Sequence, residues 1–194
     1  RATIQVNVTA ISATISTSTV LPSSACIGQN ISVAFTTTIP NGSNTYTVQL
    51  SDNTGNNFAN IPTSGTASPL TATIPASTAA GSGYKVRVIS TNPNVTGSTS
   101  NSFDINATPT PPTVTTPVNY QQNQAASPLV ATGSNLLWYP SLTGGSGSSS
   151  TPTPSTSTVG TTYYYVSQSV TNCESTRATI QVNVTAISAT ISTS

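Results

Sequence analysis

The sequence predicts an all-β protein made of two β-sandwich domains in tandem, and three observations lead to this fold class. Short runs of apolar residues alternate with polar residues along most of the 194-residue chain. Thr, Ser and Asn are abundant and disfavour helices, whereas the strong helix formers Glu, Lys and Met are nearly absent. A Pro-rich segment near residue 110 separates two sets of these runs. Low charge and clean alternation argue against disorder, the competing interpretation of such a composition.

The first set of runs predicts at least six strands between residues 11 and 106, the number found in a small sandwich. Their alternating apolar residues are Ile11, Ala13 and Ile15; Ile31, Val33 and Phe35; Tyr46, Val48 and Leu50; Leu70, Ala72 and Ile74; Tyr84, Val86 and Val88; and Phe103 and Ile105. Turn-forming residues separate the runs at Asn41-Gly42, Asp52–Asn57, Ala80–Gly83 and Asn94–Ser98.

The second set of runs lies beyond the stiff connector 107–112, which reads ATPTPP. The predicted strands are Val114–Val118, Ser127–Ala131, Leu136–Tyr139, Thr161–Val170 and Ala178–Val184. Between the third and fourth of them lies Gly144–Thr158, rich in Gly, Ser, Thr and Pro, which we expect to be a loop with one weak edge strand.

The two ends of the sequence are identical to each other. Residues 1–18 and 177–194 both read RATIQVNVTAISATISTS, so the offset between the two copies is 177 − 1 = 176 positions. Such identity predicts that the chain is part of a longer repeat array. The expected boundaries are 1–9 for the last strand of a preceding repeat's second domain, 10–107 for domain one, 108–112 for the linker, 113–186 for domain two and 187–194 for the start of the next repeat. The alternative for residues 1–9 is a strand donated to another subunit.

The charged residues are too few for most kinds of catalysis. They make up 4% of the chain, with three acids and no His, so neither a paired-carboxylate site nor a His general base is expected. The same scarcity argues against a metal site and against a bound cofactor, and the net charge of +1 argues against nucleic acid as a partner. No apolar run approaches the length of roughly 18 residues that spans a membrane. We therefore expect a chain that is not an enzyme.

Four segments resemble modules of a known group of proteins. They are YTVQLSDNTGNNF (46–58), TATIPASTAAGSGYKVRV (71–88), STNPNVTGS (90–98) and GSNLLWYPSLTGGSGSSSTPTPSTSTVGTTYYYVSQSVTNCES (133–175). The chain resembles, over about residues 11–185, the immunoglobulin-like (Ig-like) repeats of very large secreted surface proteins of Bacteroidetes-type bacteria. This resemblance implies two Ig-like sandwiches, export from the cell, and a role in adhesion, motility or cell-surface structure. It names no ligand.

The aromatic residues fall into two groups of predictions. Tyr84 follows a Gly-containing turn, as the tyrosine corner of Ig-like sandwiches does, and Trp138 lies where a core Trp is expected. We expect Tyr84, Trp138, Tyr163 and Tyr165 to pack in the cores. The candidates for side chains that face a ligand are Tyr120, Tyr139 and Tyr164.

The two cysteines lie on loops that meet at the junction of consecutive domains, if both domains have the Ig-like topology that the resemblance implies. Cys26 precedes the second strand of domain one, and Cys173 lies in the turn before the last strand of domain two. An interdomain disulfide is expected in a secreted protein. The alternative is a pair of free or intermolecular thiols.

Two functions fit these observations. A structural spacer or stalk of an extracellular adhesin or filament gains length with each repeat. A polysaccharide-binding module instead requires exposed aromatic side chains on one face. An ice-binding Thr array ranks last, because the Thr residues are scattered over both domains. Neighbouring copies of the repeat are expected partners, with lateral bundling into fibres through neutral strand edges.

Overall fold

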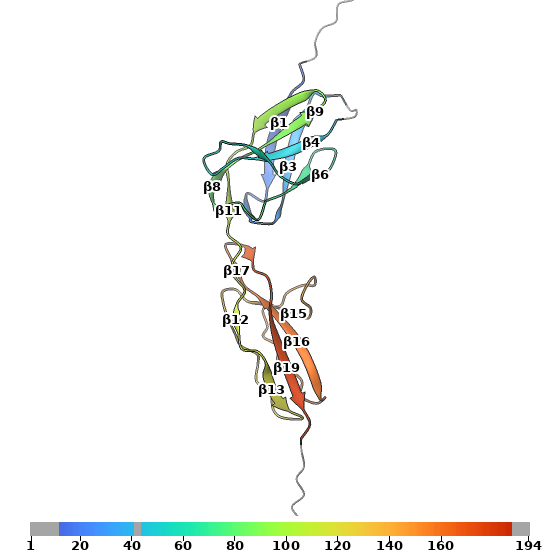
Figure 1. The fold of residues 1–194 in the computed structure, drawn as a ribbon, viewed down its shortest axis with the longest axis vertical. Helices are drawn as coiled ribbons and strands as arrows, with labels where there is room; N and C mark the ends of the chain where they lie inside the picture. Colours follow the sequence, from blue (N-terminus) through green and yellow to red (C-terminus); the bar gives the residue numbers. More distant parts are fainter. Residues whose placement is uncertain (1–11, 41–43, 188–194) are drawn as a thin grey trace, which may run out of the picture. The chain divides into compact units, whose positions relative to one another are not determined.

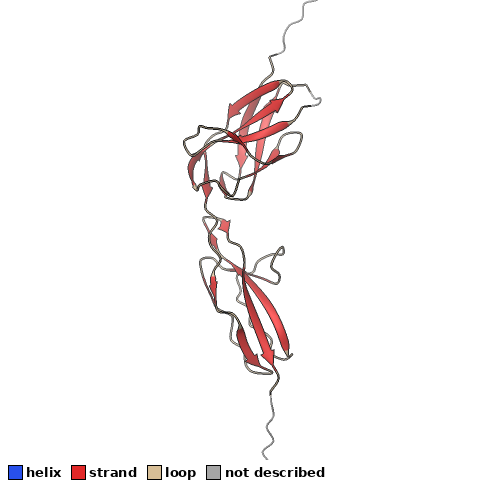
Figure 2. Cartoon of the chain, viewed as in Figure 1, coloured by secondary structure: helices blue, strands red, loops and turns tan. Residues whose placement is uncertain are grey.

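The computed structural model describes residues 12–40 and 44–187, which divide into two compact units, Arg1–Ala107 and Thr108–Ser194. Every regular element in the described residues is a β-strand (Figures 1 and 2). The prediction that residues 1–9 end a preceding domain lies outside the described residues. Three further predictions also lie outside the described residues: the apolar residue Ile11, the turn Asn41-Gly42, and the start of a next repeat at 187–194, of which only Ile187 is described.

Unit 1 contains two four-stranded sheets and one three-stranded sheet. The first sheet has the order β1 (Ile15–Leu21), β3 (Asn30–Thr37), β7 (Leu70–Thr73), β6 (Thr63–Ser64). The second has the order β10 (Asn94–Thr99), β9 (Val86–Thr91), β4 (Tyr46–Leu50), β5 (Ala59–Asn60). The third has the order β2 (Ser24–Cys26), β11 (Phe103–Asn106), β8 (Gly81–Tyr84).

The strand order identifies unit 1 as an Ig-like β-sandwich. In that fold the strands lettered A, B, E and D form one sheet and C, F and G the other. Here β1, β3, β7 and β6 take the places of A, B, E and D, and β10, β9 and β4 those of G, F and C. The hydroxyl of Tyr84 donates a hydrogen bond to the carbonyl oxygen of Ala79, five residues upstream, at 2.7 Å. This is the tyrosine corner that the sequence predicted, and it fixes the connection before β9.

The core of unit 1 is formed by apolar residues that alternate with polar or smaller residues along the strands. In β3, for example, Ile31, Val33 and Phe35 are buried while the residues between them are partly exposed. Together with Val86 and Val88 of β9 they belong to one apolar cluster that spans the unit. Each fully buried aliphatic side chain of this kind stabilises the fold by about 1.5–3 kcal/mol.

Two segments predicted as turns in unit 1 are strands instead, and glycine misled the prediction. The predicted turns Ala80–Gly83 and Asn94–Ser98 correspond to β8 and β10. A Cβ atom at Gly97 would lie 2.7 Å from the carbonyl oxygen of Val88 and 2.8 Å from a methyl carbon of Ile15. Gly97 is therefore required for the close approach of β10 to its neighbours, which is a use of glycine inside strands and not only in turns.

Unit 2 is a β-sandwich whose two layers are unequal, because only one of them is a large sheet. That sheet has the order β13 (Val118–Gln121), β19 (Ala178–Thr185), β16 (Gly160–Ser167), β15 (Leu137–Tyr139), with β13 parallel to β19. The remaining strands form two pairs: β12 (Thr113–Val114) with β14 (Ala131–Thr132), and β17 (Ser169–Val170) with β18 (Cys173–Glu174). The predicted single strand Val114–Val118 is thus divided between two sheets, because β12 pairs with β14 and β13 with β19.

The core of unit 2 is small. Its buried cluster consists of Leu129, Trp138, Val166, Ile180 and Val182. The Gly- and Ser-rich segment 144–158 forms one isolated bridge, Ser148 with Trp138, and otherwise no strand. Hydrogen bonds from the backbone N–H groups of Asn123 and Leu129 to the carbonyls of Thr156 and Pro152 hold this segment against the chain before β14. Loop backbone therefore replaces strands in the second layer of unit 2.

Candidate functional site

β16 carries three consecutive tyrosines, and its pairing with β19 determines which of them face the core (Figure 1). Tyr164 lies opposite the fully buried Ile180 in the antiparallel register. Directly opposed residues point to the same side of a sheet, and successive residues alternate. Tyr164 therefore points into the core and packs against it, partly buried. Tyr163 and Tyr165 point to the opposite face, where Tyr163 is 50% exposed.

The three tyrosines predicted to face a ligand do not form an exposed platform. Tyr120 lies beside Val184 and, like Tyr164, packs partly buried against the core of unit 2. Tyr139 is buried, with 7% of its surface exposed.

The expectation of core packing is confirmed for Tyr84 and Trp138 but is wrong for Tyr163. Tyr165 is partly buried, yet its register places it on the same outer face as Tyr163. The prediction could have used Val166, an apolar residue two positions after Tyr164 that is fully buried. Residues two apart on a strand face the same side, so Val166 indicates that Tyr164 lies on the inner face.

Tyr139 is held in place by a partly buried acidic group. Its hydroxyl donates to Oε1 of Glu174 at 2.5 Å, and the hydroxyl of Ser167 donates to the same oxygen at 2.6 Å. Burial, together with the hydrogen bond to Glu174, raises the pKa of Tyr139 above its ordinary value of 10.0. Tyr139 is therefore a structural anchor for β18.

Arg177 packs over the ring of Tyr139 and donates hydrogen bonds to the loop that follows Tyr139. The guanidinium carbon lies 3.3 Å from the ring centroid, a cation–π contact. Nη1 of Arg177 donates to the carbonyl oxygens of Ser141 at 2.7 Å and Gly144 at 2.8 Å. Glu174 and Arg177 thus both serve to fix local structure.

Asp52 organises a loop of unit 1. Its Oδ1 accepts hydrogen bonds from the N–H and hydroxyl of Thr54, at 2.9 and 2.6 Å, and from the N–H of Asn56 at 3.1 Å. Its Oδ2 accepts from the amide of Asn57 at 2.7 Å. These bonds, that of the Thr54 hydroxyl first, lower the pKa of Asp52 from 3.8 to about 2. The carboxylate lines a pocket of about 430 Å³, but so weak a base is unsuited to proton abstraction at neutral pH.

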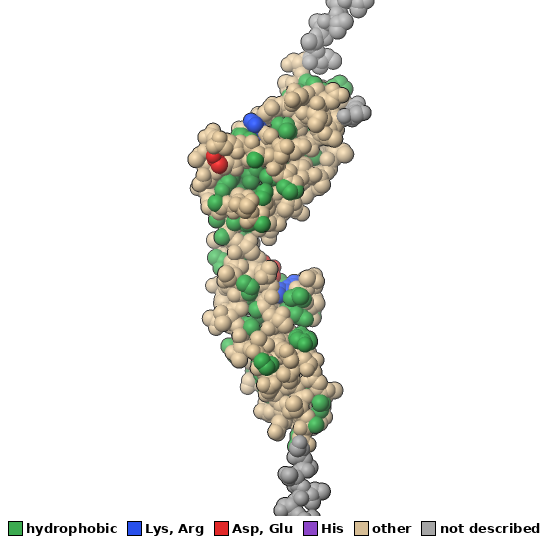
Figure 3. Space-filling model, viewed as in Figure 1, with side chains coloured by type: hydrophobic (Ala, Val, Ile, Leu, Met, Phe, Trp, Pro, Cys, Tyr) green, Lys and Arg blue, Asp and Glu red, His purple; other side chains and the backbone are tan. Residues whose placement is uncertain are grey.

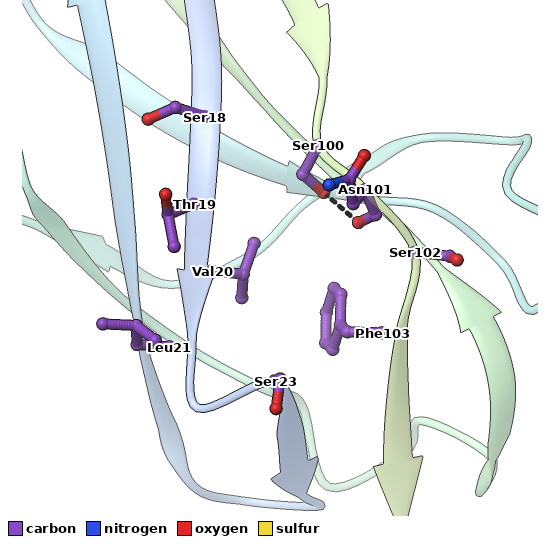
Figure 4. Close-up of a pocket in the computed structure, with 9 residues that line it drawn as sticks. All are labelled: Ser18, Thr19, Val20, Leu21, Ser23, Ser100, Asn101, Ser102 and Phe103. Carbon is purple, nitrogen blue, oxygen red and sulfur yellow. Dashed lines mark hydrogen bonds between the residues drawn. The ribbon is translucent and has the colours of Figure 1, made fainter.

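A second pocket of unit 1, of about 270 Å³, lies between the end of β1 and residues 100–103 (Figure 4). Phe103 and Val20 are among its lining residues, together with four serines. The hydroxyl of Ser100 is already used, since it donates to the carbonyl of Asn101 at 2.8 Å. None of the nine lining residues is acidic, basic or a tyrosine, so the pocket offers no group for acid–base chemistry.

Within residues 12–40 and 44–187, no group of three or more His, Cys, Asp or Glu side chains is placed to hold a metal ion. In the same part of the chain no helix is long and apolar enough to cross a membrane.

Both cysteines are disulfide-bonded, and neither is free. They are the two cysteines of the chain, and their bond to each other stays a prediction. Cys26 is the last residue of β2 and pairs with Asn106. Asn106 ends β11, which is the last strand of unit 1. Cys173 begins β18, at the end of unit 2 where Gln168 donates to the carbonyl of Thr110 at 2.7 Å. Each cysteine therefore lies, within its own unit, near the segment that connects the units.

No family model and no curated protein matches the sequence. Solved structures that are similar include SGBP-B of the mixed-linkage glucan utilization locus of Bacteroides ovatus, in complex with a mixed-linkage heptasaccharide. It is 14% identical, with a TM-score of 0.30 over 84% of this chain and 44% of that protein. The Ig1-2 module of the Drosophila receptor phosphatase DLAR is 10% identical, with a TM-score of 0.31 over 89% of this chain and 98% of that module. The eight N-terminal Ig domains of the cell adhesion molecule DSCAM are 16% identical, with a TM-score of 0.30 over 89% of this chain and 25% of that structure.

This chain thus spans less than half of SGBP-B. The Ig-like assignment rests on the strand order of unit 1.

Proposed function

We propose that this chain is a non-enzymatic spacer segment of an extracellular repeat protein, such as an adhesin or surface filament of the Bacteroidetes type. The observation that carries the proposal is the identity of residues 1–18 with residues 177–194. Exact repetition of a unit of this size adds length with every copy, whereas a catalytic site gains little from being copied end to end. The neighbouring copies of the repeat are then its first partners.

The side chains support a structural role. Among the described residues, Asp52, Glu174 and Arg177 are each bonded to groups of their own unit, and these bonds fix loops. Only 4% of the residues are charged, and the visible face is formed mainly by uncharged side chains and backbone (Figure 3). Such a surface presents neither a general base nor a cationic patch.

The disulfide supports both the location and the mechanical role. Disulfides persist in oxidising environments, which favours an extracellular protein. The predicted bond joins Cys26 to Cys173, which are separated by 147 positions (173 − 26), so in the loop-entropy model it would contribute roughly 5 kcal/mol to the stability of the folded chain. Because each cysteine lies near the connector in its own unit, we propose that the bond limits the movement of one unit about the other.

The test compares proteins of one, two and three consecutive copies of the repeat by small-angle X-ray scattering. A spacer predicts a constant increase in maximum dimension per repeat, roughly 70–85 Å for two sandwiches in line. Growth of the radius of gyration with about the 0.38 power of chain length, as in a single compact body, would contradict the proposal. The comparison has an internal control, because the same samples give the molecular mass and hence the state of association.

A further inference from the structure

We infer that the outer face of the large sheet of unit 2 is a binding surface for a neutral polysaccharide. This tyrosine–amide face consists of Tyr163 and Tyr165 of β16, Gln181 and Asn183 of β19, and Asn119 of β13. It differs from the predicted set Tyr120, Tyr139 and Tyr164, and it does not depend on the proposed spacer function.

The strand registers place these side chains on one face. Tyr163 lies opposite Gln181, and Asn119 lies beside Asn183. Tyr165 lies opposite Thr179, which is exposed. All of these residues alternate with the buried residues Ile180, Val182 and Val184 of β19, so they point away from the core. The Cα atoms of the two tyrosines are about 6.6 Å apart along the strand, from the rise of two strand residues.

The amides are fixed by bonds to one another. Asn183 donates from Nδ2 to Oδ1 of Asn119 at 3.0 Å, and its own Oδ1 accepts from the amide of Gln181 at 2.9 Å. The hydroxyl of Thr161 donates to the same oxygen at 3.0 Å. A carboxamide has two N–H donors and two acceptor positions on its oxygen, so Gln181 and Asn119 keep donor and acceptor capacity for a ligand. A fixed array loses little conformational entropy on binding.

The chemistry of the face selects the occupant. Its side chains on β13, β16 and β19 are uncharged, which matches a neutral ligand. At the β15 end of the face, Tyr165 lies opposite Tyr139, whose ring is covered by the guanidinium of Arg177. That guanidinium is already bonded to two backbone carbonyls. A polysaccharide offers apolar C–H surfaces for the exposed ring of Tyr163 and many hydroxyls for the amides. A second copy of the chain is a poorer match, because the centre of a protein interface is mainly apolar and this centre is lined by amides.

The competing site in the same unit is a pocket of about 240 Å³ lined by Tyr120, Leu129 and the exposed Val130. It is mostly apolar, with few polar groups to orient a sugar. The substitution Val130→Ala therefore serves as the matched control, since it truncates an exposed apolar side chain of unit 2 away from the tyrosine–amide face.

The experiment titrates the full chain by isothermal calorimetry with mixed-linkage β-glucan, galactomannan and amylopectin, and with the anionic polysaccharide alginate. We expect at least one neutral polysaccharide to bind and alginate not to bind. Tyr163→Ala should weaken that binding about tenfold, whereas Tyr163→Phe, which keeps the ring, should stay within about threefold and Val130→Ala should not change it. Thermal unfolding of each variant verifies that the fold is retained.

The inference is overturned if none of the three neutral polysaccharides binds, or if a folded Tyr163→Ala variant binds as the unmodified chain does. Loss of binding in Val130→Ala alone would assign the site to the pocket instead. Sedimentation of the same samples tests whether a second copy of the chain occupies the face instead. Self-association that Tyr163→Ala abolishes, without polysaccharide binding, would make the face a contact between copies of the chain.

Discussion

Three tyrosines of this chain have different roles, and the surroundings of each hydroxyl distinguish them. The hydroxyl of Tyr84 bonds to a backbone carbonyl and fixes a loop of unit 1. The hydroxyl of Tyr139 bonds to Glu174 beneath the guanidinium of Arg177. Tyr163 is half exposed on an open sheet face. Similar substitutions at these positions should therefore have different effects on the free energy of unfolding.

The tyrosine corner gives the first prediction. Tyr84→Phe removes the hydrogen bond to Ala79 and leaves its carbonyl without that donor, so unit 1 should lose about 1 kcal/mol of unfolding free energy. Urea denaturation followed by far-ultraviolet circular dichroism measures the loss. Tyr163→Phe is the control, with an expected change of less than about 0.5 kcal/mol because Tyr163 is half exposed. Equal losses in the two variants would show that the corner bond contributes nothing specific.

The second prediction concerns the pH dependence of Asp52. Its pKa in the folded chain, about 2, is below the ordinary 3.8, so ionised Asp52 stabilises the fold above about pH 4, and this contribution is lost as the pH falls through about 2. A carboxyl-carbon NMR titration should give a midpoint of about 2. Thr54→Val removes the hydroxyl donor and should move the midpoint toward 3.8. A midpoint near 3.8 in the unmodified chain would disprove the hydrogen-bonded loop.

Arg177 gives the third prediction. Arg177→Lys keeps the charge but loses the planar group that lies over Tyr139 and bonds to the carbonyls of Ser141 and Gly144. We expect a loss of about 1–2 kcal/mol and faster proteolysis within residues 141–147. Limited proteolysis with mass spectrometry locates the cleavage. Lys85→Arg, a charge-preserving exchange in unit 1, should leave the cleavage pattern unchanged.

At the scale of elements, the sequence was sufficient to predict which strand residues are buried wherever apolar and polar residues alternate strictly. Ile31, Val33 and Phe35 of β3 lie buried at every second position, as predicted. The predicted strand 178–184 likewise buries Ile180, Val182 and Val184. The prediction failed for Tyr163 to Tyr165, because three adjacent tyrosines show no alternation among themselves and the neighbouring Val166 was not used to assign their faces, which the pairing with β19 shows.

Glycine misled the prediction for a different reason. Gly97 was assigned to a turn, but it lies in β10, where a side chain would collide with β9 and β1. The sequence does not distinguish a glycine needed for a turn from one needed for close backbone approach, because the colliding atoms belong to other strands. The candidate ligand site was missed by one position in β16 for a similar reason: strand register is a tertiary property.

The unequal layers of unit 2 give a prediction at this scale. β16 and β19 pair over seven residues, whereas β12 and β14 pair over two. Amide protons of residues 180–184 should therefore exchange most slowly in unit 2, and those of 113–114 and 131–132 at least about a hundredfold faster, a difference of roughly 2.7 kcal/mol in opening free energy. Hydrogen exchange by NMR on the full chain measures both. Uniform protection across unit 2 would show that its second layer is as stable as its first.

At the scale of the whole molecule, the predicted bond between Cys26 and Cys173 determines which residues would bear a load. With that bond formed, force applied to the ends of the chain would pass along the backbone to Cys26, across the bond to Cys173, and on toward the C-terminus. The residues between the two cysteines, from β3 to β17, lie outside this path. For a spacer under tension, the bond therefore protects most of both units from mechanical unfolding, while β1 and β19 remain in the path of the force.

This arrangement gives the last prediction, the contour length of the chain under force. In the double variant Cys26→Ser, Cys173→Ser the 147 positions between the two residues become extensible, so the fully unfolded chain should be roughly 500 Å longer than the oxidised chain. Single-molecule force spectroscopy measures the difference, and reduction of the unmodified chain should reproduce the length of the variant. Equal contour lengths for the oxidised chain and the variant would show that the bond does not join Cys26 to Cys173 within one chain, and would remove the support that the disulfide gives to the spacer function.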